Sequence, residues 1–162
     1  MTETEALLAA RALLADVTPL RTDCGRCCGA ACCAPDEDGQ GGMLLFPGEE
    51  ALFRGRAGFR IVANDAVFPG GRLLLCDGTC DRAERPLACR MFPLLPHREK
   101  GAVMDRRGWA VCPLMSCGKR GLSAAFVDAV AQAGETLYAC PAHAAFLDAL
   151  HAFNAQLTLF SH

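Results

Sequence analysis

The chain has 162 residues, including 11 cysteines, and its formal net charge is −2 at pH 7. This length suffices for one domain with its own hydrophobic core, so the cysteines are not required for folding by size alone. The 16 basic residues include only two lysines and form no concentrated positive run, which argues against binding to a nucleic-acid backbone.

The N-terminal sequence and the hydrophobic pattern favour a cytoplasmic protein. Residues 1–5 are acidic, whereas a secretory signal begins with basic residues. No apolar stretch approaches the roughly 20 residues that a membrane-spanning helix needs, so no membrane contact is expected. Because cytosolic thiols are kept reduced, clustered cysteines there are expected to be metal ligands or catalytic groups rather than structural disulfides.

The first part of the chain predicts a helix followed by a cysteine-rich loop. Residues 3–16 are rich in alanine and leucine, and Pro19 ends the helix. The expected apolar stripe is incomplete and consists of Leu7, Leu8, Ala12, Leu14 and Ala15. Residues 35–42 are acidic and turn-rich, and are expected to form an exposed connection after the first cysteines.

Short strands are predicted in the middle of the chain, at residues 43–46, 59–62 and 72–76. Residues 47–53 predict a turn that leads into a short helix with carboxylates in its first turn. Between residues 76 and 117 prolines and cysteines dominate without periodicity. Irregular backbone is expected there, with a metal ion in place of the missing secondary structure.

Two helices are predicted in the C-terminal part, residues 122–160. Ser123 is expected to be the N-cap of the first helix, Gly134 its C-terminal glycine, and Pro141 part of the first turn of the second. The second helix carries apolar residues at three- and four-residue spacing, namely Phe146, Leu147, Leu150, Phe153 and Leu157. The pattern as a whole predicts one α+β domain over residues 1–162, with terminal helices, a few short strands and an irregular, metal-bound cysteine-rich core.

Cysteine spacing gives the strongest functional signal. Five cysteines lie in one ten-residue window: Cys24, Cys27, Cys28, Cys32 and Cys33. Thiolate sulfur is the ligand that zinc and iron-sulfur clusters select. A tetrahedral zinc site needs four donors at about 2.0 to 2.3 Å, usually supplied as close pairs from different parts of the chain. The pairs Cys24 with Cys27 and Cys76 with Cys80 fit this pattern, and Cys89 adds a single donor.

Two motifs follow one another in the chain. The first is a CxxCC sequence with Cys24, Cys27 and Cys28, and the second is an RPxxCRxFP segment with Arg85, Pro86, Cys89, Arg90, Phe92 and Pro93. Together, and in this order, they resemble the motifs of the YkgJ-type family of zinc- or iron-chelating domains. The resemblance covers roughly residues 22–117. The chain departs from the family because Leu20 stands where an additional cysteine is usual and because the Cys32-Cys33 pair is extra.

The resemblance implies a domain that binds zinc or iron through cysteines. A related cysteine motif in flagellin lysine methylases implies that some relatives bind an iron-sulfur cluster. The expected cofactor is therefore Zn²⁺, as one or two ions, with iron or a [4Fe-4S] cluster as the alternative. The metal ion is the one partner that the sequence indicates.

The expected metal ligands are drawn from eight cysteines: Cys24, Cys27, Cys28, Cys76, Cys80, Cys89, Cys112 and Cys117. Cys32 and Cys33 are candidates for an extra metal site. Cys140, at the entrance of the last helix, is expected to be a small buried hydrophobe.

Other residues near the cysteines have two interpretations each. Arg90 either lies close to the thiolate ligands and offsets their negative charge, or is an ordinary solvated arginine. The histidines are candidates for mixed nitrogen-sulfur ligation, but without a known cysteine-histidine spacing they are expected at the surface or at an interface; they are His97, His143, His151 and His162. Trp109 is expected to shield the metal site or to fill the core.

Three functions remain open. The first is a cysteine-ligated metal-binding protein, with a structural ion or an iron-sulfur centre. The second is a metal storage or delivery protein, in which surplus cysteines form labile sites. The third is a thiol redox enzyme using Cys24 and Cys27, although the preceding sequence lacks the βαβ pattern of thioredoxin-like sites. No nucleophile, base and orienting carboxylate stand out together, so an enzyme is not the favoured reading.

Overall fold

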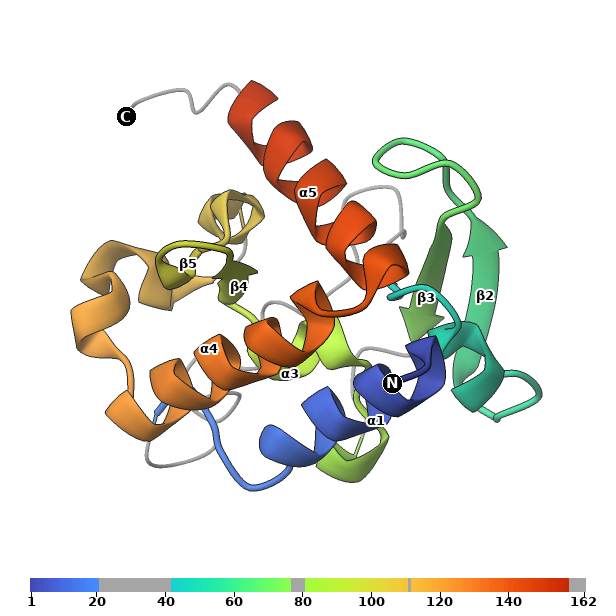
Figure 1. Ribbon diagram of the computed structural model, residues 1–162, viewed down its shortest axis with the longest axis horizontal. Helices are drawn as coiled ribbons and strands as arrows, with labels where there is room; N and C mark the ends of the chain where they lie inside the picture. Colours follow the sequence, from blue (N-terminus) through green and yellow to red (C-terminus); the bar gives the residue numbers. More distant parts are fainter. Residues whose placement is uncertain (21–41, 77–80, 111, 158–162) are drawn as a thin grey trace.

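Four α-helices and two small antiparallel sheets make up the described part of the chain, and the predicted α+β class is confirmed (Figure 1). The computed structural model describes residues 1–20, 42–76, 81–110 and 112–157. The helices are α1 (Glu3–Leu13), α3 (Leu87–Met91), α4 (Ala124–Tyr138) and α5 (Pro141–Gln156). The strands are β1 (Met43–Leu44), β2 (Phe59–Ala63), β3 (Arg72–Cys76), β4 (Leu94–His97) and β5 (Gly101–Met104).

Short 3₁₀-helices connect these elements. They are η2 (Glu49–Leu52), η3 (Arg82–Glu84), η4 (Arg106–Ala110), η5 (Pro113–Cys117) and η6 (Lys119–Gly121). In the described residues η2 takes the place of the short helix predicted after the Pro47-Gly48 turn. Gly48 precedes it with φ of 80°, a left-handed conformation that glycine adopts without a steric penalty.

The first sheet has the strand order β1-β3-β2, with both pairings antiparallel. Cys76, at the end of β3, lies opposite Phe59 at the start of β2. The strands predicted at 59–62 and 72–76 are confirmed, and the predicted strand 43–46 is shorter, since pairing covers only Met43–Leu44. Alternating and apolar runs bounded by Gly and Pro made these strands visible in the sequence.

The second sheet is the β4-β5 hairpin, and it corrects the prediction of irregular backbone between residues 76 and 117. In its register Pro96 faces Ala102. Pro96 has no N–H to donate, and its carbonyl accepts hydrogen bonds from Tyr138 Oη at 3.2 Å and His151 Nε2 at 2.7 Å instead. A proline is tolerated in a strand where its backbone points away from the partner strand, as here.

Helix α1 begins with a capping box. The Thr2 hydroxyl accepts from Glu5 N at 3.1 Å, and the Glu5 carboxylate accepts from Thr2 N at 2.7 Å. The helix ends at Leu13 rather than at residue 16. Its buried face consists of Ala6, Leu7, Ala10 and, just after its end, Leu14. The predicted stripe was therefore wrong for three members that are exposed: Leu8, Ala12 and Ala15.

Helix α4 lies at the centre of the domain and packs against α1, β4 and β5. Ser123 precedes it as the predicted N-cap residue, but its side chain makes no capping hydrogen bond. The helix continues to Tyr138, so Gly134 is an interior residue and not the predicted C-terminal glycine. Gly134 is buried, and a Cβ atom there would lie 2.7 Å from Pro96 Cβ. Close approach of α4 to β4 explains the glycine.

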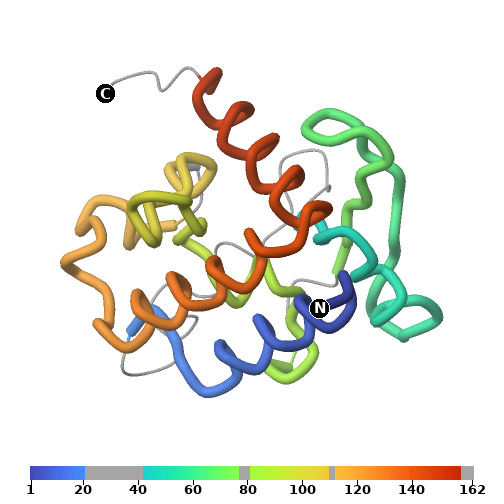
Figure 2. The backbone as a smooth tube through the Cα atoms, viewed as in Figure 1, coloured from blue at the N-terminus to red at the C-terminus, as the bar shows by residue number. Residues whose placement is uncertain are grey.

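Helix α5 starts at Pro141, as predicted. The chain turns sharply between α4 and α5 (Figure 2). Its residues Phe146, Leu147 and Leu150 are buried. They join the main hydrophobic core, whose largest buried side chains include Phe46, Phe126, Leu87, Met91, Leu94 and Leu137. A second cluster, Leu45, Phe53 and Leu74, lies against the three-stranded sheet. In the described residues no helix has the length and apolar character to span a bilayer.

Of the two roles expected of Trp109, filling the core is excluded, because the residue is 54% exposed, and shielding the metal site stays a prediction. The expectation that His143 lies at the surface or at an interface was wrong, and His162 lies outside the described residues. His143 is fully buried in α5, where Nε2 donates to the Glu3 carbonyl of α1 at 2.8 Å and the ring packs edge-on against Phe46. His97 and His151 are half-buried and face one another, with ring centroids 5.1 Å apart. Phe92 and Pro93 of the RPxxCRxFP segment are buried.

Candidate metal centre

Most of the predicted sulfur ligands lie outside the described residues. They are Cys24, Cys27, Cys28, Cys80 and the candidates for an extra site, Cys32 and Cys33. The described part of the chain contains the four remaining predicted ligands and Cys140. Their positions define what the fold offers to a metal.

Cys76 and Cys89 are both half-buried, and each belongs to a regular element. Cys76 is the last residue of β3. Cys89 is the third residue of α3, a five-residue helix whose Leu87, Ala88 and Met91 face the core. The two cysteines therefore stand on elements fixed by burial of their neighbours, while their own side chains remain partly accessible.

Cys112 and Cys117 bracket η5. Cys112 is half-buried and precedes the 3₁₀-helix, where its carbonyl accepts from Met115 N at 3.2 Å. Cys117 is the last residue of η5 and is exposed. Its Cβ approaches Gly121 so closely that a Cβ on Gly121 would lie 2.5 Å away.

Cys140 differs from these residues, and its prediction is confirmed. It is 6% exposed and precedes α5, where its carbonyl accepts from Ala144 N at 2.9 Å. It behaves as the small buried hydrophobe expected of many cysteines without a chemical role. Within residues 1–20, 42–76, 81–110 and 112–157, no three His, Cys, Asp or Glu side chains come together in a group suited to hold a metal ion.

A buried carboxylate anchors the segment that carries Cys89. Glu49, at the start of η2, is 0% exposed. Its Oε1 accepts from Leu87 N at 2.6 Å and from Arg11 Nη1 at 3.1 Å, and its Oε2 accepts from Phe46 N at 3.0 Å. The carboxylate thus caps the first turn of α3, two residues before Cys89, and joins it to α1 and to η2.

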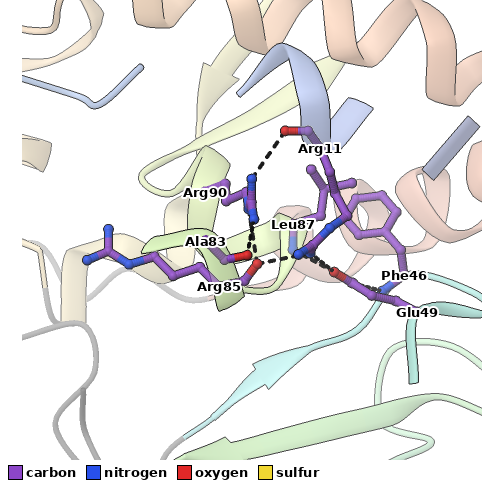
Figure 3. A network of polar contacts seen from close by, with 7 residues as sticks. All are labelled: Arg11, Phe46, Glu49, Ala83, Arg85, Leu87 and Arg90. Atoms are coloured by element: carbon purple, nitrogen blue, oxygen red, sulfur yellow. Dashed lines mark hydrogen bonds and ion pairs between the residues drawn. The ribbon is translucent and has the colours of Figure 1, made fainter. Parts of the chain in front are cut away.

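Arg90 closes the same network from the other side (Figure 3). Its guanidinium donates to the Arg85 carbonyl at 3.1 Å, the Arg11 carbonyl at 3.2 Å and the Ala83 carbonyl at 2.8 Å. Arg11 Nη1 also donates to the Arg85 carbonyl, at 2.9 Å. Arg90 is therefore not an ordinary solvated arginine: it holds η3 and α3 to α1. The side chain of Arg85 points away from the network, as Figure 3 shows.

The network has more positive than negative charge. Burial lowers the pKa of the Arg90 guanidinium; the charges of Arg11, Arg82 and Arg85 act in the same direction, and Glu49 opposes them. Burial raises the pKa of the Glu49 carboxyl, while the Leu87 and Phe46 amides and Arg11 act against this rise. Arg82 Nη2 is buried and makes no hydrogen bond in the described structure.

Sequence reasoning singled out Arg90 but missed Arg11 and Glu49. Nothing local distinguishes Glu49 from Glu50 beside it, or Arg11 from other arginines. The two partners are 38 residues apart, and the Arg11 contact to Arg85 spans 74 residues. One signal was available for Arg11: it interrupts the apolar pattern of α1, a helix that packs against the core.

Comparison of the chain with protein-family models, with curated proteins and with solved structures gave no match.

Proposed function

We propose that this protein binds zinc or iron through cysteine thiolates, with the metal as a structural centre or as part of an iron-sulfur cluster. The ligand pool is the eight cysteines named in the sequence analysis, and Cys89 is the described member whose backbone the fold anchors most firmly. The resemblance of the motifs to the CxxCC domains is the starting point of the proposal, and the described residues add two observations to it.

The first observation, on which the proposal mainly depends, is that hydrogen bonds from Glu49 and Arg90 hold the segment 85–90 in place. A cysteine whose backbone is already held binds a metal more tightly, because ordering the chain on binding would otherwise cost free energy. Glu49 caps the helix that bears Cys89, and Arg90 ties it to two further segments. The Cys89 backbone is thus fixed, and its side chain is half-buried rather than packed into the core as that of Cys140 is.

The second observation is the surplus of guanidinium groups around this segment. Among the described residues, the charges that act on Arg90 come from three arginines and one carboxylate, Glu49. A four-thiolate zinc site carries two surplus negative charges, which nearby cations offset. The unpartnered Nη2 of Arg82 is a donor available to such an anionic centre.

A closed site of four thiolates would make the metal structural, since a catalytic zinc keeps one position open for water. Iron in a cluster would add electron transfer. Metal storage or delivery is the alternative that the exposed thiol of Cys117 favours, because an exposed ligand exchanges its ion more readily than a buried one. Stoichiometry separates the two: a single tightly held centre supports the structural role, and several weakly held ions support storage.

The deciding experiment is elemental analysis of anaerobically purified protein together with its visible spectrum. We expect zinc or iron at one equivalent or more; a colourless zinc protein identifies the zinc form, and visible absorption with iron and sulfide identifies the cluster. Protein that is folded by circular dichroism and contains neither metal contradicts the proposal.

Cysteine variants test the ligand assignment. Cys89→Ser is expected to lower both metal content and stability, because binding of a structural metal contributes directly to the free energy of folding. Cys140→Ala is the matched control, since that thiol is buried and is not a proposed ligand. It should lose some stability and keep its metal. Equal metal content in the two variants would exclude Cys89 from the centre.

A further inference from the structure

The described residues contain three buried side-chain atoms without a hydrogen-bond partner, and Nη2 of Arg82 is the only one of them that belongs to a permanently charged group. Arg82 begins η3 and is half-buried as a whole. Removing a donor of a charged group from water without an acceptor in exchange costs free energy. A buried guanidinium nitrogen of this kind therefore indicates an acceptor that the described residues do not supply.

No carboxylate of the described residues serves as that acceptor. Glu84, in the same 3₁₀-helix, forms its ion pair with Arg56 at 3.6 Å, and Asp81 just before the helix is exposed. Glu49 opposes the positive charges of this cluster, but both of its oxygens already accept hydrogen bonds from other groups. In the described part of the chain the charge of Arg82 is therefore left without a paired anion.

The backbone at Arg82 is held in place relative to Cys89. Arg90, which follows Cys89 in α3, donates to the carbonyl of Ala83, which follows Arg82 in η3, at 2.8 Å. It also donates to the Arg85 carbonyl, just after η3, at 3.1 Å. Burial lowers the pKa of the Arg90 guanidinium, and the charge of Arg82 acts in the same direction. The Arg82 guanidinium therefore lies close enough to α3 for its charge to act on the residue next to Cys89.

We propose, on the basis of the metal-binding function proposed above, that Arg82 is a positioning residue of the thiolate centre, whose Nη2 donates to a ligand sulfur and so strengthens metal binding. In the chain Arg82 stands between two predicted ligands, Cys80 and Cys89. Four thiolates around Zn²⁺ carry two surplus negative charges. A hydrogen bond from a cation to such an anionic acceptor is roughly twice as strong as one between neutral groups. The bound centre thus supplies both the acceptor and the negative charge that Arg82 lacks.

The test compares the full-length protein with its Arg82→Met variant, each loaded with Co²⁺ as a coloured substitute for Zn²⁺. Competition with a chelator should show about tenfold weaker metal binding by the variant, since residues that hydrogen-bond to ligands contribute about 10–100-fold to metal affinity. The sulfur-to-cobalt charge-transfer band should move to longer wavelength, because a sulfur that loses a hydrogen bond to a cation gives up its electrons more easily. The d–d bands, which report the tetrahedral geometry, should stay unchanged. A purely structural role would change the d–d bands instead.

Two further variants make the result specific. Arg82→Lys keeps a charged donor and should recover most of the metal affinity; if Arg82→Met does not fold, Arg82→Gln takes its place as the uncharged variant. Arg54→Met is the matched control, because it removes one positive charge from a side chain that is 70% exposed, and it should bind Co²⁺ as the parent does.

Three results would overturn the inference about Arg82. They are parent-like affinity and spectrum in the uncharged variant, altered d–d bands in that variant, and an equal loss of affinity in Arg82→Lys. A parent protein that holds neither zinc nor iron contradicts the proposed function itself, so the two failures are distinguishable.

Discussion

Gly134 of α4 and Pro96 of β4 face each other so closely that a Cβ atom on Gly134 would lie 2.7 Å from Pro96 Cβ. No ordinary contact between two carbon atoms is that short, and the proline ring and its strand cannot rotate away as a flexible side chain would. The approach of the central helix to the β4-β5 hairpin therefore depends on the missing side chain.

Gly134→Ala is expected to destabilise the protein by up to about 2 kcal/mol, although alanine is the better helix former. Overpacking costs about 1–3 kcal/mol, which exceeds the gain of about 1 kcal/mol in helix propensity. Chemical denaturation measures the change. Glu135→Ala, at the exposed next position, is the control and should lie within about 0.5 kcal/mol of the parent. A more stable Gly134→Ala variant would show that α4 and β4 are not tightly packed.

Glu49→Gln is expected to cost about 3–5 kcal/mol of stability. The substitution removes the charge that compensates buried Arg11 and turns an amide NH₂ toward groups that are themselves donors. Equilibrium unfolding measures the loss, and Glu50→Gln, next in the chain and partly exposed, should change stability little. Combined with Arg11→Met, the double variant should lose less than the sum of the single variants, because the two residues share one interaction. If the stability losses of the two single variants simply added in the double variant, Glu49 and Arg11 would not interact.

Titration of Tyr138, the only tyrosine of the chain, tests the packing of α4 against Pro96 and α5. Burial raises the pKa of the Tyr138 phenol to about 12; the charge of Asp148 adds to the rise, and Arg98 above the ring opposes it. Phenolate absorbance of the folded protein should therefore show a midpoint near 12, and that of the unfolded chain one near 10.

The same shift has a consequence for stability at high pH. A phenol with a higher pKa in the folded state than in the unfolded state contributes its full stability below pH 10 and loses it as the pH rises through about 12. Asp148→Asn should lower the midpoint of the folded protein, because it removes a negative charge near the phenol. A folded-state midpoint near 10 would contradict the described environment of Tyr138.

Removal of the metal tests the proposed structural role of the thiolate centre. A chelator strong enough to strip the protein should lower Tm, and addition of zinc or, for a cluster, reconstitution with iron and sulfide should restore it. Thermal unfolding followed by circular dichroism is the measurement. An unchanged Tm in protein shown by elemental analysis to be stripped would mean that the metal, if bound, does not support the fold.

The sequence predicted those helices and strands whose bounds depend on residues close together in the chain. Alternation bounded by Pro and Gly found β2 and β3, and Pro141 marked the start of α5. The β4-β5 hairpin was missed because Pro96 argues against a strand unless its backbone points away from the partner, which only the register reveals. Gly134 was misread for a similar reason: the sequence shows a helix-breaking residue but not the proline that lies against it.

The sequence could predict which cysteines are candidate ligands, but not which residues hold their backbone in place. Cys24, Cys27 and Cys28 lie outside the described residues. Their role as metal ligands therefore stays a prediction. Cys89 is described, and its anchoring by Glu49 and Arg11 depends on contacts across 38 and more residues, which no local pattern encodes. The prediction that His143 lies at the surface or at an interface was wrong for the same reason, since its partner is the Glu3 carbonyl, 140 residues away.

That partner bears on how the protein is made. His143 Nε2 donates to the Glu3 carbonyl across 140 residues, and α1 packs on α4. During translation α1 emerges well before α4, which covers much of its apolar face, and before His143 of α5. The nascent chain therefore carries an uncovered amphipathic helix until α4 and α5 have left the ribosome.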